Sequence, residues 1–194
     1  MPNLSLDLKR TAVLALDFQK GIVAGSAMAK ERNTVQKAKS VLDGARLAGL
    51  PVVYVVVQFR EGYPEISPRN RMFGGLRNVQ RLLIGGDDTQ IDPSITPVKG
   101  DVVVARPRVN GFFNSQLQTV LVSKDIDTLV LMGIASNLVV ESTARYAADS
   151  DYRVIVLEDC CASFSVEAHN FVMTNIFNRI GEVSSSTEFL ASLK

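Results

Sequence analysis

The stretch Thr11-Ala-Val-Leu-Ala-Leu16, followed at once by Asp17, decides the fold of this chain. A run that is apolar at nearly every position predicts a strand buried on both faces, as in parallel sheets covered by helices. Apolar residues at helical spacing follow across 35–45, and Gly49 is expected to stop that helix. A buried strand followed by a helix is the first half of a doubly wound α/β unit.

Four further apolar runs follow along the chain, and a short sixth strand is expected after them. These expected strands lie at 51–57, 101–105, 128–132, 152–157 and 181–184. Further helical patterns lie at 114–124, 137–149 and 165–179. This alternation predicts a single doubly wound three-layer domain over residues 1–194, with a six-stranded, mostly parallel sheet and right-handed crossovers.

Residues 59–100 interrupt this rhythm with four prolines and several glycines, and they hold only a short helix candidate near 79–84. A loop of this length inside one domain is usually functional, so we expect a lid or a contact between subunits. The segment 58–86 carries five arginines against two glutamates. That balance favours a small substrate with a carboxylate, because arginine binds carboxylates through paired hydrogen bonds. Arginines that face solvent or another subunit are the alternative.

The composition narrows the classes of protein and of site. With 46% hydrophobic and 21% charged residues, the 194-residue chain is globular rather than disordered. Its net charge of +1 gives no strong field toward nucleic acid or a membrane, so neither is expected as a partner.

No apolar stretch is long enough for a signal peptide or a membrane span, which predicts a cytoplasmic protein. One histidine, His169, and two adjacent cysteines, Cys160 and Cys161, exclude a histidine-rich zinc site and a disulfide framework. No metal or other cofactor is expected.

Chemistry in an open α/β sheet takes place beyond the carboxyl ends of the strands. Asp17 stands at the end of the first strand, where partial burial would raise its pKa and suit it to acid–base work. A carboxylate that caps the next segment is the alternative. Ser136 is expected as the N-cap of the helix at 137–149, whose first amides face the same edge and suit an anion or a developing oxyanion.

Three segments at these strand ends together resemble the signature blocks of the isochorismatase-like hydrolases, within the cysteine hydrolase superfamily. They are LALDFQ at 14–19, GDVVVARPRVNGF at 100–112 and GIASNLVVESTA at 133–144. The resemblance extends from about Thr11 to Phe189 and implies a hydrolase with the strand order 3-2-1-4-5-6, as a homodimer or larger homo-oligomer. Cysteine hydrolases of this family use an aspartate, a lysine and a cysteine to open amide-type bonds through a thioester. Its isochorismatase branch instead cleaves a vinyl ether without a covalent intermediate.

Only one of the family's three catalytic residues is unchanged in this chain. Asp17 matches the aspartate, Arg106 stands at the lysine position, and Val139 stands at the cysteine position. Valine cannot form an acyl-enzyme, so the thioester route is closed unless Cys160 or Cys161 serves as the nucleophile. Arginine can bind an anion or a developing negative charge, but it stays protonated and cannot shuttle a proton as lysine does.

Further residues are candidates for substrate binding, for the walls of the pocket or for the core. The candidate substrate-binding residues are Gln19, Gln58, Arg60, Phe112, Ile134, Ala135 and Ser136. The aromatic residues expected to form apolar walls are Tyr63, Phe73, Phe112 and Phe113. The two cysteines are expected past the fifth strand, where buried structural thiols are the common outcome. His169 falls on the apolar face of the helix at 165–179, which favours a hydrogen-bonded core histidine. The resemblance also implies a cis peptide between Ile134 and Ala135.

Two functions remain open at this point. The first is a hydrolase that acts on a small anionic metabolite without a cysteine nucleophile, with Asp17 as general acid or base and Arg106 holding the negative charge. The retained Asp17 and the block at 133–143 favour it. The second is a catalytically inactive family member that binds a small molecule or serves as a scaffold. The changes at Arg106 and Val139 favour that alternative.

Overall fold

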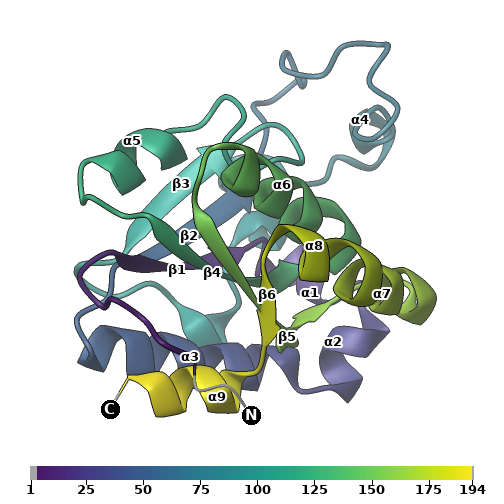
Figure 1. Cartoon of the computed structure of the whole chain (residues 1–194). Coiled ribbons are helices and arrows are strands. Elements are labelled where there is room, and N and C mark those ends of the chain that lie inside the picture. Colours follow the sequence, from purple (N-terminus) through teal and green to yellow (C-terminus); the bar gives the residue numbers. More distant parts are fainter. Residues whose placement is uncertain (1–3, 194) are drawn as a thin grey trace.

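The computed structural model describes residues 4–193 and contains one six-stranded sheet. All neighbouring strands run parallel, and the spatial order is β3-β2-β1-β4-β5-β6, which confirms the expected architecture (Figure 1). The strands are β1 (Thr11–Leu16), β2 (Val52–Val57), β3 (Val102–Arg106), β4 (Thr128–Ile134), β5 (Arg153–Ala162) and β6 (Glu182–Ser184). Every side chain of β1, β2 and β4 is buried, because these central strands are covered on both faces.

Helices cover the two faces of the sheet, with α3 and α9 on one side and α5 and α6 on the other (Figure 1). The helices are α1 (Lys20–Val23), α2 (Ala27–Glu31), α3 (Thr34–Leu47), α4 (Leu76–Val79), α5 (Leu117–Val122), α6 (Glu141–Asp149), α7 (Val166–Val172), α8 (Asn178–Ile180) and α9 (Ser186–Ser192). The longest, α3, buries an apolar stripe that includes Val35, Ala38 and Leu42. Gly49 follows it with φ +77°, a conformation that glycine adopts without strain. Among residues 4–193, no helix is long and apolar enough to cross a membrane.

The later helices are shorter or more irregular than predicted. The helix expected at 114–124 is helical only as α5. The π-helical turn Ser136–Val140 precedes α6, and a second such turn, Met173–Phe177, separates α7 from α8. Apolar periodicity finds the buried face of these segments, but it does not distinguish an α-helix from a π-helical turn.

Strand β5 is longer than expected, and this corrects the predicted place of the cysteines. After a register shift on β4 between Leu131 and Gly133, β5 pairs again, with Cys161 opposite Gly133 and Ala162 opposite Ile134. Cys160 and Cys161 therefore lie inside the strand and not beyond it. The polar pair at 158–159 interrupts the apolar run in the sequence, although the backbone continues as a strand.

The segment 59–100 leaves the sheet, and its first part forms a lobe that carries α4 (Figure 1), whereas Ile95 near its end belongs to the main core. We call residues 59–100 the insert. Five of its residues form a small apolar cluster together with Val57 of β2, namely Phe59, Tyr63, Ile66, Phe73 and Leu82. The helix expected near 79–84 is wrong, because α4 ends at Val79 and Gln80 adopts a left-handed conformation with φ 50°. The insert is thus an ordered part of the molecule with little regular structure.

Candidate active site

A cavity of about 180 Å³ lies beyond the carboxyl ends of β1, β3 and β4, where the topology predicts a ligand site. We call it the inner pocket. Its lining residues are Asp17, Ile22, Val57, Met72, Phe73, Leu76, Leu82, Arg106, Val109, Ile134, Ala135, Leu138, Val139 and Phe164. Within the described residues, Asp17 and Arg106 are the only ones of these with polar side chains. The pocket therefore combines one charged pair with an apolar wall, as small-molecule sites commonly do.

Asp17 and Arg106 form a buried ion pair at the base of this pocket. Asp17 follows β1 with φ 55°, in the left-handed region that aspartate tolerates, and its amide donates to the carbonyl of Val55 at 2.9 Å. Nη2 of Arg106 donates to Oδ2 of Asp17 at 2.6 Å. Burial raises the pKa of the Asp17 carboxyl above its ordinary value of 3.8, while the charge of Arg106 opposes the rise.

The pair leaves polar atoms without partners. Among the described residues, Oδ1 of Asp17 and Nε and Nη1 of Arg106 are buried and make no hydrogen bond. Buried polar groups in native proteins are nearly always hydrogen-bonded. One carboxylate acceptor atom and two guanidinium donor atoms therefore have unused hydrogen-bonding capacity in two side chains that line the pocket.

The chain after β4 forms the opposite wall. A Cβ on Gly133 would lie 2.3 Å from the carbonyl oxygen of Leu16, so only glycine allows β4 to approach β1 this closely. The peptide between Ile134 and Ala135 is cis, as the resemblance implies. Both residues line the inner pocket, whereas Ser136 is fully buried and does not.

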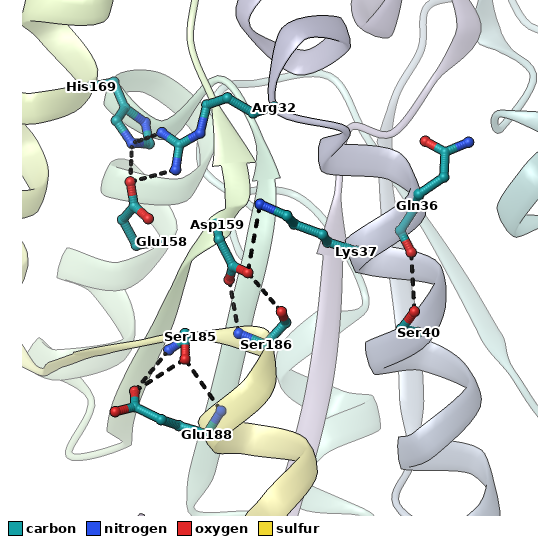
Figure 2. A network of polar contacts seen from close by, with 10 residues as sticks. All are labelled: Arg32, Gln36, Lys37, Ser40, Glu158, Asp159, His169, Ser185, Ser186 and Glu188. Carbon is teal, nitrogen blue, oxygen red and sulfur yellow. Dashed lines mark hydrogen bonds and ion pairs between the residues drawn. The ribbon is translucent and has the colours of Figure 1, made fainter. Parts of the chain in front are cut away.

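The prediction that Ser136 caps the following helix is wrong. The N-cap is Ala135, without a side-chain hydrogen bond, and the hydroxyl of Ser136 lies 3.0 Å from Nδ1 of His169. His169 is fully buried, and its Nε2 lies 2.7 Å from Nη1 of Arg32 and 3.0 Å from Oε1 of Glu158 (Figure 2). His169 is thus a hydrogen-bonded core residue behind the pocket wall. No sequence pattern pointed to Arg32, whose role depends on α2 and β5 meeting in space.

None of the described thiols reaches the pocket. Val139, at the family's cysteine position, lines it and is 2% exposed. Cys160 and Cys161 are fully buried elsewhere, in β5. Burial raises the pKa of both, that of Cys161 to about 12, which keeps them as unreactive thiols.

Several predicted binding residues have other contacts. Gln19 is fully buried, where its Nε2 donates to the carbonyl of Val57 at 2.9 Å and its Oε1 accepts from the amide of the same residue at 2.8 Å. Arg60 pairs with Glu65 at 2.5 Å. Phe112 stacks on Tyr146, with ring centroids 4.7 Å apart. Neither these three predicted residues nor Gln58 lines the inner pocket.

The insert contributes an apolar wall to the pocket and not the expected basic one. Its lining residues are Met72, Phe73, Leu76 and Leu82, of which only Phe73 was predicted. Three of its arginines, Arg60, Arg77 and Arg81, make contacts elsewhere. Arg77 donates to the carbonyl of Ile66 at 2.7 Å, and Arg81 donates to that of Gly21 at 2.7 Å. Over residues 4–193, no three or more His, Cys, Asp or Glu side chains are grouped so that they could hold a metal ion.

Comparison with known proteins agrees with this architecture. A model of the Isochorismatase domain family matches residues 11–188. The chain is 33% identical to the uncharacterized isochorismatase family protein YwoC of Bacillus subtilis, with 100% of both chains covered. It is 30% identical to the ureidoacrylate amidohydrolase RutB of Stutzerimonas stutzeri, with 97% of this chain and 85% of that protein covered.

Two solved structures share this fold. A cysteine hydrolase from Pseudomonas syringae pv. phaseolicola matches with a TM-score of 0.89 at 25% identity, covering 98% of this chain and 95% of that one. N-carbamoylsarcosine amidase from Thermoplasma acidophilum matches with a TM-score of 0.72 at 26% identity, covering 91% and 96%. The strand order, the pocket at the strand ends and these matches have one explanation: the chain belongs to the isochorismatase family of hydrolases.

Proposed function

We propose that this chain hydrolyses an amide-type bond with water as the nucleophile, at the Asp17–Arg106 pair. The observation that carries the proposal is the set of unpartnered atoms at the base of the inner pocket, Oδ1 of Asp17 and Nε and Nη1 of Arg106. With valine at position 139 and both cysteines in β5, no described thiol is placed to attack a substrate. Water activated by a carboxylate takes that role.

The free atoms favour a planar, neutral head group on the substrate. An amide or ureide offers an N–H that can donate to Asp17 and a carbonyl oxygen that can accept from Arg106. Because the two side chains neutralise each other, a full negative charge gains less here than beside an unpaired arginine. A ureidoacrylate amidohydrolase and an N-carbamoylsarcosine amidase among the similar proteins support this substrate class.

Asp17, Arg106 and one water molecule suffice for the proposed hydrolysis. The Asp17 carboxylate takes a proton from water as the water oxygen bonds to the substrate carbonyl carbon, and Arg106 stabilises the oxyanion that forms. Asp17 then gives its proton to the leaving nitrogen as the carbon–nitrogen bond breaks. The products are an amine and a carboxylic or carbamic acid. The apolar wall strengthens these electrostatic contacts by excluding water.

A binding or scaffold protein without turnover is the second candidate. It is favoured by the close ion pair, which fills part of a small cavity, and by the valine at the family's cysteine position. Turnover separates the two functions. The panel contains small amides, ureides and an isochorismate-type vinyl ether, tested with the wild type, Asp17→Asn and Arg179→Gln. Arg179 is an exposed arginine on α8 and serves as the charge control.

We expect hydrolysis of an amide or ureide by the wild type and by Arg179→Gln, and its loss in Asp17→Asn. The asparagine variant retains the shape of Asp17 but cannot take a proton from water. Activity that survives in Asp17→Asn would overturn the role given to the carboxylate. Turnover of the vinyl ether alone would overturn the amide class. No turnover of any compound would favour the binding protein.

A further inference from the structure

We propose that a groove beside the inner pocket, built around Arg108, binds a carboxylate at the far end of the substrate. We call it the outer groove. This inference rests on the proposed function in one respect, namely that the inner pocket holds an amide-type head group. It assigns the anion to a different arginine from the one that the sequence indicated, since Arg106 is already paired with Asp17.

The outer groove adjoins the inner pocket. Met72, Phe73 and Val109 line both of them, so the two spaces share a wall. Phe113 and Tyr146 form an aromatic rim, with 59% and 44% of their surface exposed. A ligand whose head group lies against Asp17 and Arg106 and whose apolar middle passes this shared wall would place its other end at Arg108.

Arg108 is held in place without being neutralised. Its Nη1 donates to the carbonyl of Pro107 at 2.6 Å, and its Nη2 donates to the carbonyl of Glu65 at 3.0 Å. Carbonyl oxygens orient a guanidinium but carry no net charge to cancel its own. Within residues 4–193 no carboxylate forms a salt bridge with Arg108. Two of its five N–H groups are used, and three remain for a ligand.

Two acidic residues adjoin the groove, Glu65, whose carbonyl accepts from Arg108, and Glu141, which precedes the lining residue Ser142, and each is paired with another arginine. The carboxylate of Glu65 accepts from Arg60 at 2.5 Å. Glu141, at the start of α6, forms an ion pair with Arg145. The charge of Arg108 is therefore not compensated, and an anion that binds there need not displace an internal partner.

A second donor stands in the same groove. Oδ1 of Asn70 accepts from the amide of Phe73 at 3.1 Å, which orients its Nδ2 as a donor that makes no hydrogen bond to the described residues. Asn110, by contrast, is occupied on both sides, by the carbonyl of Ser142 and the amide of Phe112. One guanidinium fork with one amide donor suits a planar monoanion, and a carboxylate is the group that a single arginine binds through two parallel hydrogen bonds.

Binding of two matched probes tests this assignment without any need for turnover. The probes are 3-ureidopropionate, which has a ureide head and a carboxylate tail, and its methyl ester, which has the same head and no charge. Affinities are measured by calorimetry or NMR titration at low salt for the wild type, Arg108→Gln, Arg108→Lys and the control Arg179→Gln. Thermal melts confirm that each variant is folded.

We expect the wild type and Arg179→Gln to bind the acid more tightly than the ester. Arg108→Gln should weaken binding of the acid about tenfold and leave the ester unchanged, as expected when a charge-assisted hydrogen bond is lost. Arg108→Lys should retain part of the preference, since it keeps the charge and loses the fork.

Equal binding of acid and ester by the wild type, or equal weakening of both by Arg108→Gln, would overturn the outer groove as a carboxylate site. If the wild type binds the acid more tightly than the ester but hydrolyses neither, the carboxylate site at Arg108 would be supported and the proposed hydrolase activity would be contradicted. No binding of either probe to the wild type would count against both the head-group assignment and the groove.

Discussion

Arg106 and Asp17 meet through a single short hydrogen bond, 2.6 Å from Nη2 to Oδ2, although both side chains are almost fully buried. A two-pronged contact would have satisfied both carboxylate oxygens and two guanidinium nitrogens. The one-pronged contact leaves both partners with free atoms at the base of the pocket. The pair therefore keeps unused hydrogen-bonding atoms at the inner pocket, which both side chains line.

Arg106→Met tests how much the buried ion pair between Asp17 and Arg106 contributes to stability. The variant leaves the Asp17 carboxylate buried without a cation, so the free energy of unfolding should fall by about 3–5 kcal/mol, the usual cost of breaking a buried pair. Urea unfolding at neutral pH measures it. The double variant Asp17→Asn/Arg106→Met should lose less than the single one, because no buried charge remains. A double variant that is less stable than Arg106→Met would contradict this explanation.

Val139→Cys should create a reactive thiol where the wild type has none. Cys160 and Cys161 are fully buried with raised pKa values, so iodoacetamide should not modify the folded wild type. A cysteine at position 139 would line the same pocket as Arg106, and a positive charge in the pocket favours a thiolate. Mass spectrometry of the labelled protein should find one adduct, on the new cysteine. Labelling of the folded wild type at Cys160 or Cys161 would show that β5 is more open than the structure indicates.

Glu158→Gln should flatten the dependence of stability on acid pH. Hydrogen bonds with His169 and Arg32 lower the pKa of the Glu158 carboxyl from an ordinary 4.5 to about 2. Because folding favours the ionised form, this carboxylate contributes stability above about pH 4.5, and the contribution is lost as the pH falls from there toward 2. Urea midpoints measured at steps between pH 7 and pH 3 should fall less in Glu158→Gln than in the wild type.

The control for this series is Glu61→Gln, which removes the same charge from an exposed side chain that forms no salt bridge to the described residues. Its midpoints should follow those of the wild type at every pH. Parallel curves for the wild type and Glu158→Gln would mean that the contacts of Glu158 with His169 and Arg32 carry no net stability.

Gly133→Ala should disrupt the contact between β1 and β4. The added Cβ would meet the Leu16 carbonyl oxygen at 2.3 Å and the Leu16 Cβ at 2.7 Å, and backbone atoms of a central strand cannot move aside cheaply. We expect a loss of at least about 3 kcal/mol in the free energy of unfolding, the upper range for overpacking. Gly75→Ala is the matched control, because φ there is −70° and no atom lies within 4 Å of the new Cβ. It should change stability by no more than about 1 kcal/mol.

The sheet and the residues that meet at its edge are predictable from sequence for one physical reason. Parallel strands joined by helices bring their carboxyl ends to one edge, so Asp17 and Arg106 meet once the strands are recognised. Val139 joins them because its turn begins where β4 ends. The direction of a side chain beyond the strand is less constrained. Gln19, two residues past Asp17, turns inward to bond the backbone of Val57 and does not line the inner pocket.

The apolar half of the pocket is not predictable in the same way. Met72 and Leu76 come from the insert, which has no sustained periodicity to show which of its residues point inward. The link between Arg32 and His169 likewise joins side chains 137 residues apart through their meeting in space. Local sequence patterns predict helices and strands, whereas these contacts depend on how a loop or a helix end packs against the sheet.

The separate apolar cluster of the insert has a consequence for how this molecule can diverge. The sheet, with Asp17 and Arg106, is held by the main core, while Met72, Phe73, Leu76 and Leu82 belong to the insert, whose smaller cluster includes Val57 of β2. Substitutions at these positions would change one wall of the pocket directly, whereas Asp17 and Arg106 stand at strand ends outside the insert. The charged pair and one apolar wall of the pocket thus lie in different parts of the chain, so the shape of that wall can change in the insert while the charged pair is kept.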